Sequence, residues 1–400
     1  KPPISVHVAM RSPVLLRESR EMRSAEMRAR KKDDPPLAID SKPFSLDEMS
    51  ARALLQQESQ VLLSRAKQLG HERVHLVCFG FDVDAEALAV RVFSSLWSIH
   101  FGAPRVTVLT PDAAAAEAAF RARYAEAFAT PALWSPDIAF MPFDWEQASI
   151  GPALMQAVED ARGAPSAAVV AAGADPRNIQ LAIALKRAGN SGLRWPIPIF
   201  MAETSVSEFS RQYASGEGGA YYAFLRAFGA HQANATRKRV IEGALDRGAA
   251  IAHEHYQKGL GKREPMSMRA LQAATRDWGE VLETYRAANR AVSDAAMVKM
   301  WDAGWRPAGK KEKGETEPAI AEDLLPRMAQ REHDRWMAER LIAGWRPTAP
   351  GEKRDNDLMA HDKLIPWDKL NEADKNNDVV QVRAGVDIAR ATHPQGFIRA

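Results

Sequence analysis

The chain has 400 residues, of which 46% are hydrophobic and 26% charged, enough for two or three domains with their own cores. Its 54 Lys and Arg residues against 51 Asp and Glu leave a net charge of +3, so the composition gives no argument for a nucleic-acid partner. The single cysteine, Cys78, excludes a disulfide framework and a cysteine-rich zinc site and fits a reducing, cytoplasmic setting. No segment approaches the roughly 18 apolar residues of a transmembrane helix.

Residues 1–44 have the least globular composition. Eight basic and three acidic side chains lie between Arg11 and Lys32, and Asp33-Asp-Pro-Pro36 follows. This pattern predicts a basic linker or solvated tail. The alternative is a juxtamembrane segment, because basic residues gather on the cytoplasmic side of membrane helices and the chain begins at Lys1 without an initiator methionine. The chain would then be the cytosolic part of an inner-membrane protein whose membrane domain precedes it.

Residues 45–70 are predicted to form a lead-in helix. Ser45-Leu-Asp-Glu48 is a capping box, and apolar residues then recur at helical spacing as far as Gly70. We expect this helix to pack on the domain that follows it.

Between residues 71 and 235, predicted strands and helices alternate. The strands are expected at 74–79, 105–109, 137–141, 167–172 and 197–201, and the helices at 85–98, 113–129, 151–161 and 175–189. This alternation predicts an α/β fold with a doubly wound parallel sheet, whose ligands would lie beyond the carboxyl ends of the strands. A helix-like bridge at 237–250 is expected to lead out of this domain.

The first strand closes at Gly80, and Gly80, Asp82 and Ala85 occupy the three glycine positions of a G-x-G-x-x-G turn. This strand and turn resemble the TrkA-type nucleotide-binding domain of potassium-conductance regulators, and the resemblance implies a Rossmann-like domain in a homo-oligomer. Asp82 would place a carboxylate where a pyrophosphate approaches the backbone, so the usual NAD binding is not expected. Asp112, after the second strand, is the candidate partner of a ribose hydroxyl. The alternative is a domain kept for packing and assembly.

Two segments, 246–308 and 321–400, share a pattern of residues. His253-Glu-His-Tyr256 matches His333-Asp-Arg-Trp336 at an offset of 80 residues, and a second set matches at an offset near 89. That set pairs Asp277-Trp278, Leu282, Tyr285-Arg286 and Asn289 with Pro366-Trp367, Leu370, Lys375 and Asn377. We predict an internal repeat, with residues 309–320 as a charged linker. A third similarity, Ala-Gly-Trp-Arg-Pro at 303–307 and 343–347, does not follow the offsets of 80 and 89 residues. It indicates only that two helices end in a similar way.

The second segment is predicted to hold two helices around a polar loop. One helix covers 333–342 and ends at Gly344, the loop covers 351–357, and the other helix begins near Pro366. The segment resembles the ryanodine receptor repeat, the RyR domain. The residues that carry this resemblance are His333-Asp-Arg-Trp336, Gly344-Trp345, Arg354-Asp-Asn356, His361, Leu364, Pro366-Trp367, Leu370, Lys375 and Asp378. It implies a mainly α-helical tandem RyR-like domain with a degenerate first copy at 246–308 and a second at 321–400.

Catalytic and metal-binding motifs are absent from the sequence. There is no HExxH, GxSxG, Walker A or paired-cysteine motif, and His253 and His255 are wrongly spaced for two zinc ligands on one helical face. The acidic run Asp355-Asn-Asp357 lacks the glycine and glutamate of an EF-hand loop, so no calcium site is predicted. His333 and His361 have no recognisable nucleophile partner. We therefore predict no catalytic residue, no metal and no defined cofactor.

Aromatic and cationic residues of the second segment make it the predicted ligand site. Indole faces and guanidinium groups suit a flat, anionic molecule such as a nucleotide. The predicted binding residues are Trp336, Arg340, Trp345, Arg354, Asn356, His361, Trp367, Lys375 and Arg383. The first hypothesis is a cytoplasmic ligand-sensing module that controls an attached membrane channel or another effector. The alternatives are an NAD(P)-dependent oxidoreductase using the sheet domain, and a structural or docking protein that binds no small molecule.

Overall fold

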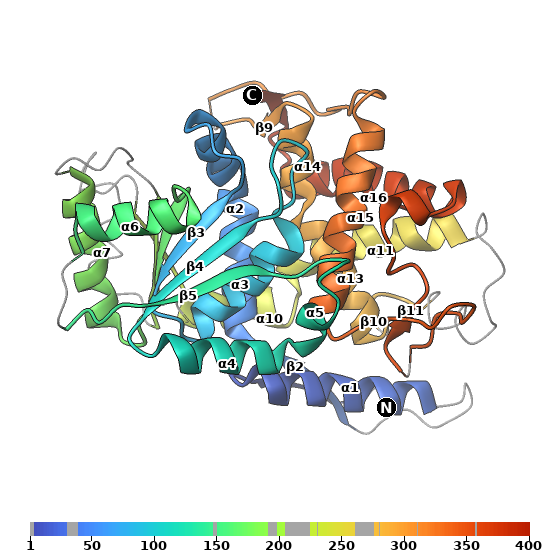
Figure 1. Ribbon diagram of the computed structural model, residues 1–400. Coiled ribbons are helices and arrows are strands. Elements are labelled where there is room, and N and C mark those ends of the chain that lie inside the picture. Colours follow the sequence, from blue (N-terminus) through green and yellow to red (C-terminus); the bar gives the residue numbers. More distant parts are fainter. Residues whose placement is uncertain are drawn as a thin grey trace.

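Six parallel strands form the largest sheet in the computed structural model of the chain (Figure 1). The strands are β3 (His75–Phe79), β4 (Arg105–Thr110), β5 (Asp137–Pro142), β6 (Ala167–Val170), β7 (Ile199–Ala202) and β8 (Leu225–Phe228). Their order is β5-β4-β3-β6-β7-β8. The chain reverses direction across the sheet beside β3, as in a Rossmann-like fold, so the predicted α/β class is confirmed.

The structure describes residues 4–29, 39–146, 150–190, 198–204, 225–229, 231–260, 276–279, 281–309, 311–356 and 358–400. Five of the six strands fall within two residues of their predicted bounds. The sixth, β8, was not predicted as a strand; its two middle residues are exposed, so it lacks the continuous apolar run of the other strands.

Alternate side chains of the strands enter two cores, one on each face of the sheet. Leu76 and Cys78 of β3 pack with α2 (Leu46–Gln68), α3 (Val83–Ser95) and α4 (Ala113–Arg123). Val77 and Phe79 pack with α6 (Pro152–Arg162) and α7 (Asp175–Asn190). Because strand side chains alternate, helices cover both faces and the sheet is doubly wound.

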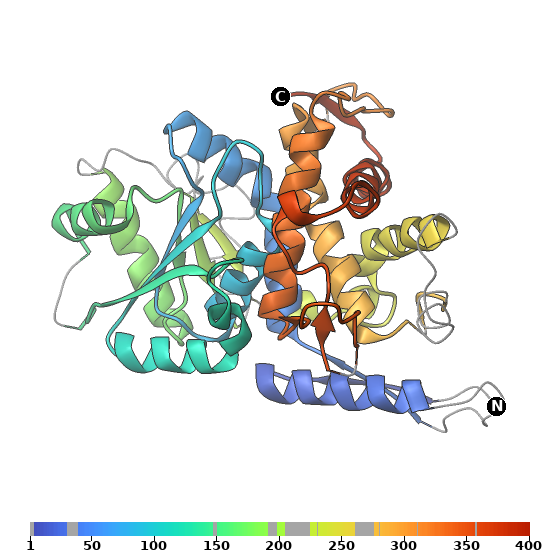
Figure 2. The ribbon, with the colours of Figure 1, turned by 45° about the vertical axis from the view of Figure 1, so that its right-hand side comes forward.

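The N-terminal segment is folded, which corrects the prediction of a solvated tail. Strands β1 (Ile4–Ala9) and β2 (Ile39–Phe44) pair in parallel, and α1 (Pro13–Ala29) lies between them in the chain and beneath the helical part in Figure 2. Arg20 pairs with Glu48 at 2.9 Å, and Arg23 pairs with Asp40 at 2.8 Å. Two of the basic residues that suggested a tail, Arg20 and Arg23, therefore serve as partners for carboxylates.

The capping box forms only in part. Ser45 Oγ accepts a hydrogen bond from the backbone N–H of Glu48 at 3.1 Å, so Ser45 is the N-cap of α2. The carboxylate of Glu48 turns to Arg20 and not back to the cap. This exchange binds α1 to α2.

The C-terminal part is built from helices. They are α11 (Arg247–Leu260), α13 (Glu283–Asp294), α14 (Ala296–Asp302), α15 (Leu325–Ile342) and α16 (Glu372–Thr392). The predicted bridge at 237–250 is broken into α10 (Arg237–Val240), a 3-10 turn at Ala244–Asp246 and the start of α11. The helix predicted near Pro366 begins instead at Glu372, because the side chain of Asn371 caps it by accepting from the N–H of Asp374.

The two Ala-Gly-Trp-Arg-Pro sequences form similar helix ends. Gly304 follows α14 with a φ of 79°, and Gly344 follows α15 with a φ of 89°. Glycine adopts such angles without steric cost. The residues that follow form the short strands β9 (Trp305–Pro307), paired with β12 (Phe397–Arg399), and β10 (Arg346–Pro347), paired with β11 (Ala360–His361).

One apolar core joins the sheet to the helical part. Helices α2 and α3 contribute to it from the sheet side, and Met337, Leu341 and Trp345 contribute from α15 and its C-terminal turn. Polar contacts reinforce the junction: Arg335 donates to the carbonyl oxygen of Ser94 at 3.1 Å, and Arg52 pairs with Asp294 at 2.9 Å. Within the described residues, no helix is long and apolar enough to cross a bilayer.

A buried acid at this junction makes stability depend on pH. Asp302 accepts hydrogen bonds from Ser98 Oγ at 2.5 Å and from the N–H of Ile99 at 3.1 Å, and burial raises its pKa to about 7. An unfolded chain releases this proton near the ordinary aspartate pKa of 3.8. Between those values the folded state holds a proton that the unfolded state lacks, so stability falls as pH rises through the window.

We predict that Asp302→Asn flattens this dependence. One proton accounts for at most about 1.4 kcal/mol of unfolding free energy per pH unit. Urea unfolding of both proteins at several pH values between 5 and 7 measures the difference in slope. Equal slopes would show that Asp302 is ionised in the folded protein throughout that range.

Candidate functional site

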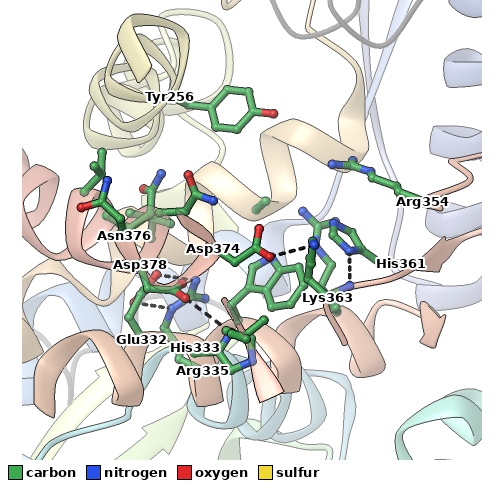
Figure 3. A pocket seen from close by; sticks show the side chains of 18 of the residues that line it. Tyr256, Glu332, His333, Arg335, Arg354, His361, Lys363, Asp374, Asn376 and Asp378 are labelled. Atoms are coloured by element: carbon green, nitrogen blue, oxygen red, sulfur yellow. Dashed lines mark hydrogen bonds and ion pairs between the residues drawn. The ribbon is translucent and has the colours of Figure 1, made fainter. Parts of the chain in front are cut away.

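A cavity of about 430 Å³ lies between two pairs of helices. Helices α11 and α13 form one wall, and α15, α16 and the loop from β10 to β11 form the other (Figure 3). In Figure 3, Tyr256 lies above the cavity, Asp374 and Lys363 lie at its centre, and Arg354 and His361 lie on the side opposite Asn376. Its volume falls in the range of small-molecule sites.

Two guanidinium groups and an indole form the cationic side of the site. The guanidinium carbons of Arg340 and Arg354 lie 4.9 Å and 5.3 Å from the centre of the Trp345 ring. Arg354 also lies 5.3 Å from the Tyr285 ring, and its Nε donates to the side-chain oxygen of Asn356 at 2.7 Å. The two cations are thus held side by side against aromatic surface.

The loop that carries Arg354 is closed by its own backbone. Asp355 and Ala360 exchange hydrogen bonds of 2.9 Å and 2.8 Å, and the N–H of Leu358 donates to the carboxylate of Asp355 at 3.0 Å. The N–H of Arg346 donates to the carbonyl oxygen of Met359 at 2.9 Å, which fixes the loop to the end of α15. Arg354 is therefore positioned by the backbone before any ligand arrives.

The cations produce a positive potential inside the cavity. Burial, followed by the charges of Arg354 and Arg340, lowers the pKa of His361 well below its ordinary value. Burial and the neighbouring Arg354 also lower the pKa of Arg340. An imidazole that stays neutral beside two guanidinium groups indicates a site prepared for negative charge.

The acidic side of the cavity is neutralised by its own partners. Asp374 pairs with Lys363 at 2.7 Å, and Asp378 lies 3.4 Å from Nδ1 of His333. Glu332 pairs with Arg335 at 2.8 Å and with Lys299 at 3.0 Å. Burial lowers the pKa of His333, but the hydrogen bond and charge of Asp378 outweigh it and raise that pKa. The acids therefore do not cancel the charge of Arg354.

Two buried polar groups of the wall have no hydrogen-bond partner within the described residues. They are the hydroxyl of Tyr285 and the side-chain oxygen of Gln381. A buried polar group without a partner costs about 1–3 kcal/mol. A ligand that bonded to both would remove this cost, so they are candidate contacts for its polar edge.

The two walls repeat the same local geometry at constant offsets. Nε2 of His253 lies 2.8 Å from the carbonyl oxygen of Arg276, and Nε2 of His333 lies 2.8 Å from that of Ile365. The rings of His253 and Trp278 lie 6.0 Å apart, and those of His333 and Trp367 lie 5.8 Å apart.

Residues of α13 and α16 that are 89 positions apart also occupy corresponding places in the two walls. Nδ1 of His253 lies 3.4 Å from the side-chain nitrogen of Asn289, where Nδ1 of His333 faces Asp378. Asn289 therefore corresponds to Asp378 and not to Asn377, which corrects the pairing drawn from sequence. Tandem copies would produce this geometry, although membership of 246–308 in the RyR family stays a prediction.

Residues of the segments 246–308 and 321–400 that correspond at these offsets line the same cavity. The pairs that line it are Tyr256 with Trp336, Tyr285 with Asp374, Ala288 with Asn377, Asn289 with Asp378, and Val292 with Gln381. The cavity therefore lies between the two segments, and both contribute to its wall.

The structure brings four of the predicted binding residues to the cavity and places the others around it. Trp336, Arg340, Arg354 and His361 line it. Trp345 and Asn356 lie behind Arg354, and Lys375 stacks over Trp367 at 5.7 Å outside the lining. Arg383 is 58% exposed and pairs with Glu322 at 3.0 Å, so it does not reach the cavity.

Sequence reasoning missed Tyr256, Tyr285, Lys363, Asp374 and Gln381 as lining residues. Tyr256 and Tyr285 belong to the internal echo, which was the one signal that could have identified them. The other three depend on how the helices turn toward each other.

The turn after β3 is closed against its neighbours. Gly80 has a φ of 85°, and a Cβ built on it would lie 2.3 Å from the carbonyl oxygen of Ala171. Asp82 caps α3 by accepting from the N–H groups of Asp84 and Ala85, and Asp112 caps α4 by accepting from Ala115. Gly80 and Asp82 of this turn, and Asp112 after β4, therefore all have local structural roles.

Comparison with known families shows one similarity. Residues 317–391 match the RyR domain family, so the predicted resemblance holds for the second copy. The matched region is less than a fifth of the chain and includes α15, the cavity loop and nearly all of α16. No curated protein shows significant similarity to the chain. Within the described residues, no group of His, Cys, Asp and Glu side chains is arranged to hold a metal ion.

Two tryptophans of the site are expected to differ in their contribution to stability. Trp345 is 1% exposed and belongs to the core shared with the sheet, whereas Trp336 is half-buried in the cavity wall. We predict that Trp345→Ala lowers the free energy of unfolding by about 3–5 kcal/mol. Trp336→Ala should lower it by about 1–2 kcal/mol. Urea unfolding followed by far-UV circular dichroism measures both, and equal losses would mean that Trp336 is a core residue.

Proposed function

We propose that the chain is a cytoplasmic ligand-sensing module that binds a nucleotide-like anion between its two RyR-like copies. The observation that carries this proposal is the position of Arg354. Its guanidinium group lies between the rings of Trp345 and Tyr285 at the edge of the cavity. Its Nε donates a hydrogen bond to Asn356, a neutral amide, so its charge is not cancelled there.

The shape of the ligand follows from the groups around Arg354. Phosphates and carboxylates bind guanidinium groups through paired hydrogen bonds. The rings of Trp336, Tyr256 and Tyr285 offer flat surfaces on which a planar group can stack. The Tyr285 hydroxyl and the Gln381 oxygen can bond to the edge of that group. An anionic head joined to a planar heterocycle satisfies all three features.

The site supports binding and gives no support for catalysis. The histidines of the wall are held by other groups: His333 by the carbonyl oxygen of Ile365 and by Asp378, and His361 by accepting from the N–H of Lys363 at 3.1 Å. Neither is bonded to a hydroxyl or thiol nucleophile in the described part of the chain. We therefore favour a sensor over the oxidoreductase alternative.

The junction between the helical part and the sheet offers a route for a signal. Trp345 contacts Arg340 and Arg354 on one side, and on the other it belongs to the core that includes α2 and α3. A ligand that draws these arginines toward itself would change the packing of that indole. We propose that the sheet domain passes this change to a channel or another effector, as its resemblance to potassium-conductance regulators implies, within a homo-oligomer.

A ligand screen tests the binding proposal. We expect at least one of NAD, NADH, ATP, ADP-ribose and cyclic mono- or oligonucleotides to raise the thermal unfolding midpoint of the chain. At a hundred times its dissociation constant, a ligand adds about 2.7 kcal/mol to stability. Calorimetric titration then gives its affinity.

Matched arginine variants show where the ligand binds. Arg354→Ala should weaken binding by about tenfold or more, because a hydrogen bond to a charged group contributes about 1.5–3 kcal/mol. Arg383→Ala removes the same charge from the exposed part of α16 and should leave affinity unchanged. Binding that survives Arg354→Ala would locate the ligand elsewhere, and a screen without any binder would favour the docking alternative.

A further inference from the structure

A second cavity, of about 250 Å³, lies on the other side of the first RyR-like copy. Its wall comes from β1, α1 and β2 of the N-terminal segment, from α2 and α10, and from the start of α13. It shares no lining residue with the cavity between the two copies. The N-terminal segment and the first copy thus both contribute to the wall of this cavity.

The acidic residues of this wall all have cationic partners. Glu48 pairs with Arg20 at 2.9 Å, and Glu242 pairs with Arg237 at 3.1 Å. Asp246 is shared by Arg52 at 2.7 Å and Arg290 at 2.8 Å. Glu283 pairs with Arg290 at 2.6 Å and with Arg20 at 3.4 Å. Each of these carboxylates is thus in an ion pair with another cation, and Glu283 and Asp246 act on Arg286 only through their charge.

Arg286 is the clearest of those cations. It donates hydrogen bonds of 2.8 Å and 2.7 Å to the carbonyl oxygens of Trp278 and Gly279, and it stacks at 5.5 Å over the Trp278 ring. Its buried Nε has no hydrogen-bond partner, and it makes no ion pair with a carboxylate in the part of the chain that the structure describes. Burial lowers its pKa, which reflects the cost of holding the charge there.

Arg239 supplies a second such cation from a different helix. Its guanidinium donates to the side-chain oxygen of Asn234, a neutral partner. It forms no ion pair with a carboxylate among the described residues, and burial lowers its pKa as well. Two guanidinium groups that form no ion pair with a carboxylate among the described residues therefore line one small cavity.

The second RyR-like copy has an ion pair at the position where Arg286 has none. There, Glu372 and Lys375 form an ion pair of 2.9 Å on the first turn of α16. The corresponding residues of α13, at an offset of 89, are Glu283 and Arg286. Glu283 has turned to Arg290 and Arg20, so Arg286 has lost the carboxylate that its counterpart keeps.

We propose that this second cavity binds a small oxyanion, a phosphate or carboxylate group, between Arg286 and Arg239. The anion would replace the missing carboxylate and accept from the free Nε of Arg286. Because His7 of β1 and Lys42 of β2 also line the cavity, the bound anion would tie the N-terminal segment to the first copy. This site is independent of the nucleotide-like ligand proposed above.

Inorganic phosphate is the first probe, applied to the full chain. The unfolding midpoint is measured at increasing phosphate against chloride of equal ionic strength, and acetate is tested in the same way. We expect phosphate to raise the midpoint, and Arg286→Gln to weaken the apparent affinity by at least tenfold. A response to acetate as well would assign the site to oxyanions in general, and a response to phosphate alone would assign it to phosphate groups.

Matched variants separate this site from the other one. Arg239→Gln, on the half-exposed α10, should weaken phosphate binding and gives a second test if Arg286→Gln does not fold. Arg383→Gln and Arg354→Ala should leave the phosphate response intact. Phosphate that stabilises Arg286→Gln and Arg239→Gln as much as the parent chain, or that stabilises none of these proteins, would overturn the proposal. A response lost only in Arg354→Ala would place phosphate in the first cavity and also overturn it.

Discussion

The packing of Trp345 is the constraint on which both the fold and the site depend. Its indole is almost completely buried in the core that α15 shares with α2 and α3. The guanidinium groups of Arg340 and Arg354 nevertheless lie over the same ring. An indole can do both because its apolar surface and its π face serve different neighbours. The φ of 89° at Gly344 turns the chain so that the next residue enters this core. The cationic side of the cavity is therefore in direct contact with the core behind it.

Buried ion pairs impose a second constraint, on how the parts of the chain are assembled. Arg52 of α2 is held by Asp294 of α13 and by Asp246, and Arg290 shares that same Asp246. Removing one member would leave a buried charge without a partner, which costs more than the pair contributes. These pairs join residues up to about 240 positions apart, so they favour one arrangement of sheet, N-terminal segment and helices over others of equal apolar burial.

The sequence predicted the parts of the molecule whose signals are local. Five strands could be predicted because parallel strands that are buried on both faces are continuous apolar runs in the sequence. The end of α15 at Gly344 could be predicted because glycine is common at helix C-termini. The N-terminal segment was missed because its basic composition resembles a tail, while the acids that balance Arg20 lie at Glu48 and Glu283. Arg383 was misplaced for a geometric reason: it follows Asp378 by five residues, about 140° around α16. Tyr285 and Gln381 line one cavity only because α13 and α16 lie on its two sides, which no local pattern encodes.

Differences between the segments 246–308 and 321–400 give the cavity between them its polarity. His253 and His333 hold the same carbonyl contact, but the first faces the amide of Asn289 and the second faces the carboxylate of Asp378. The hydrogen bond and charge of Asp378 raise the pKa of His333 against the effect of burial. In the same way, Tyr285 stands where the second copy has Asp374. The first copy thus supplies neutral aromatic and amide groups, and the second supplies the charges. An asymmetric site of this kind, built from nearly symmetric helices, would fix the direction in which a ligand with one anionic and one planar end can enter.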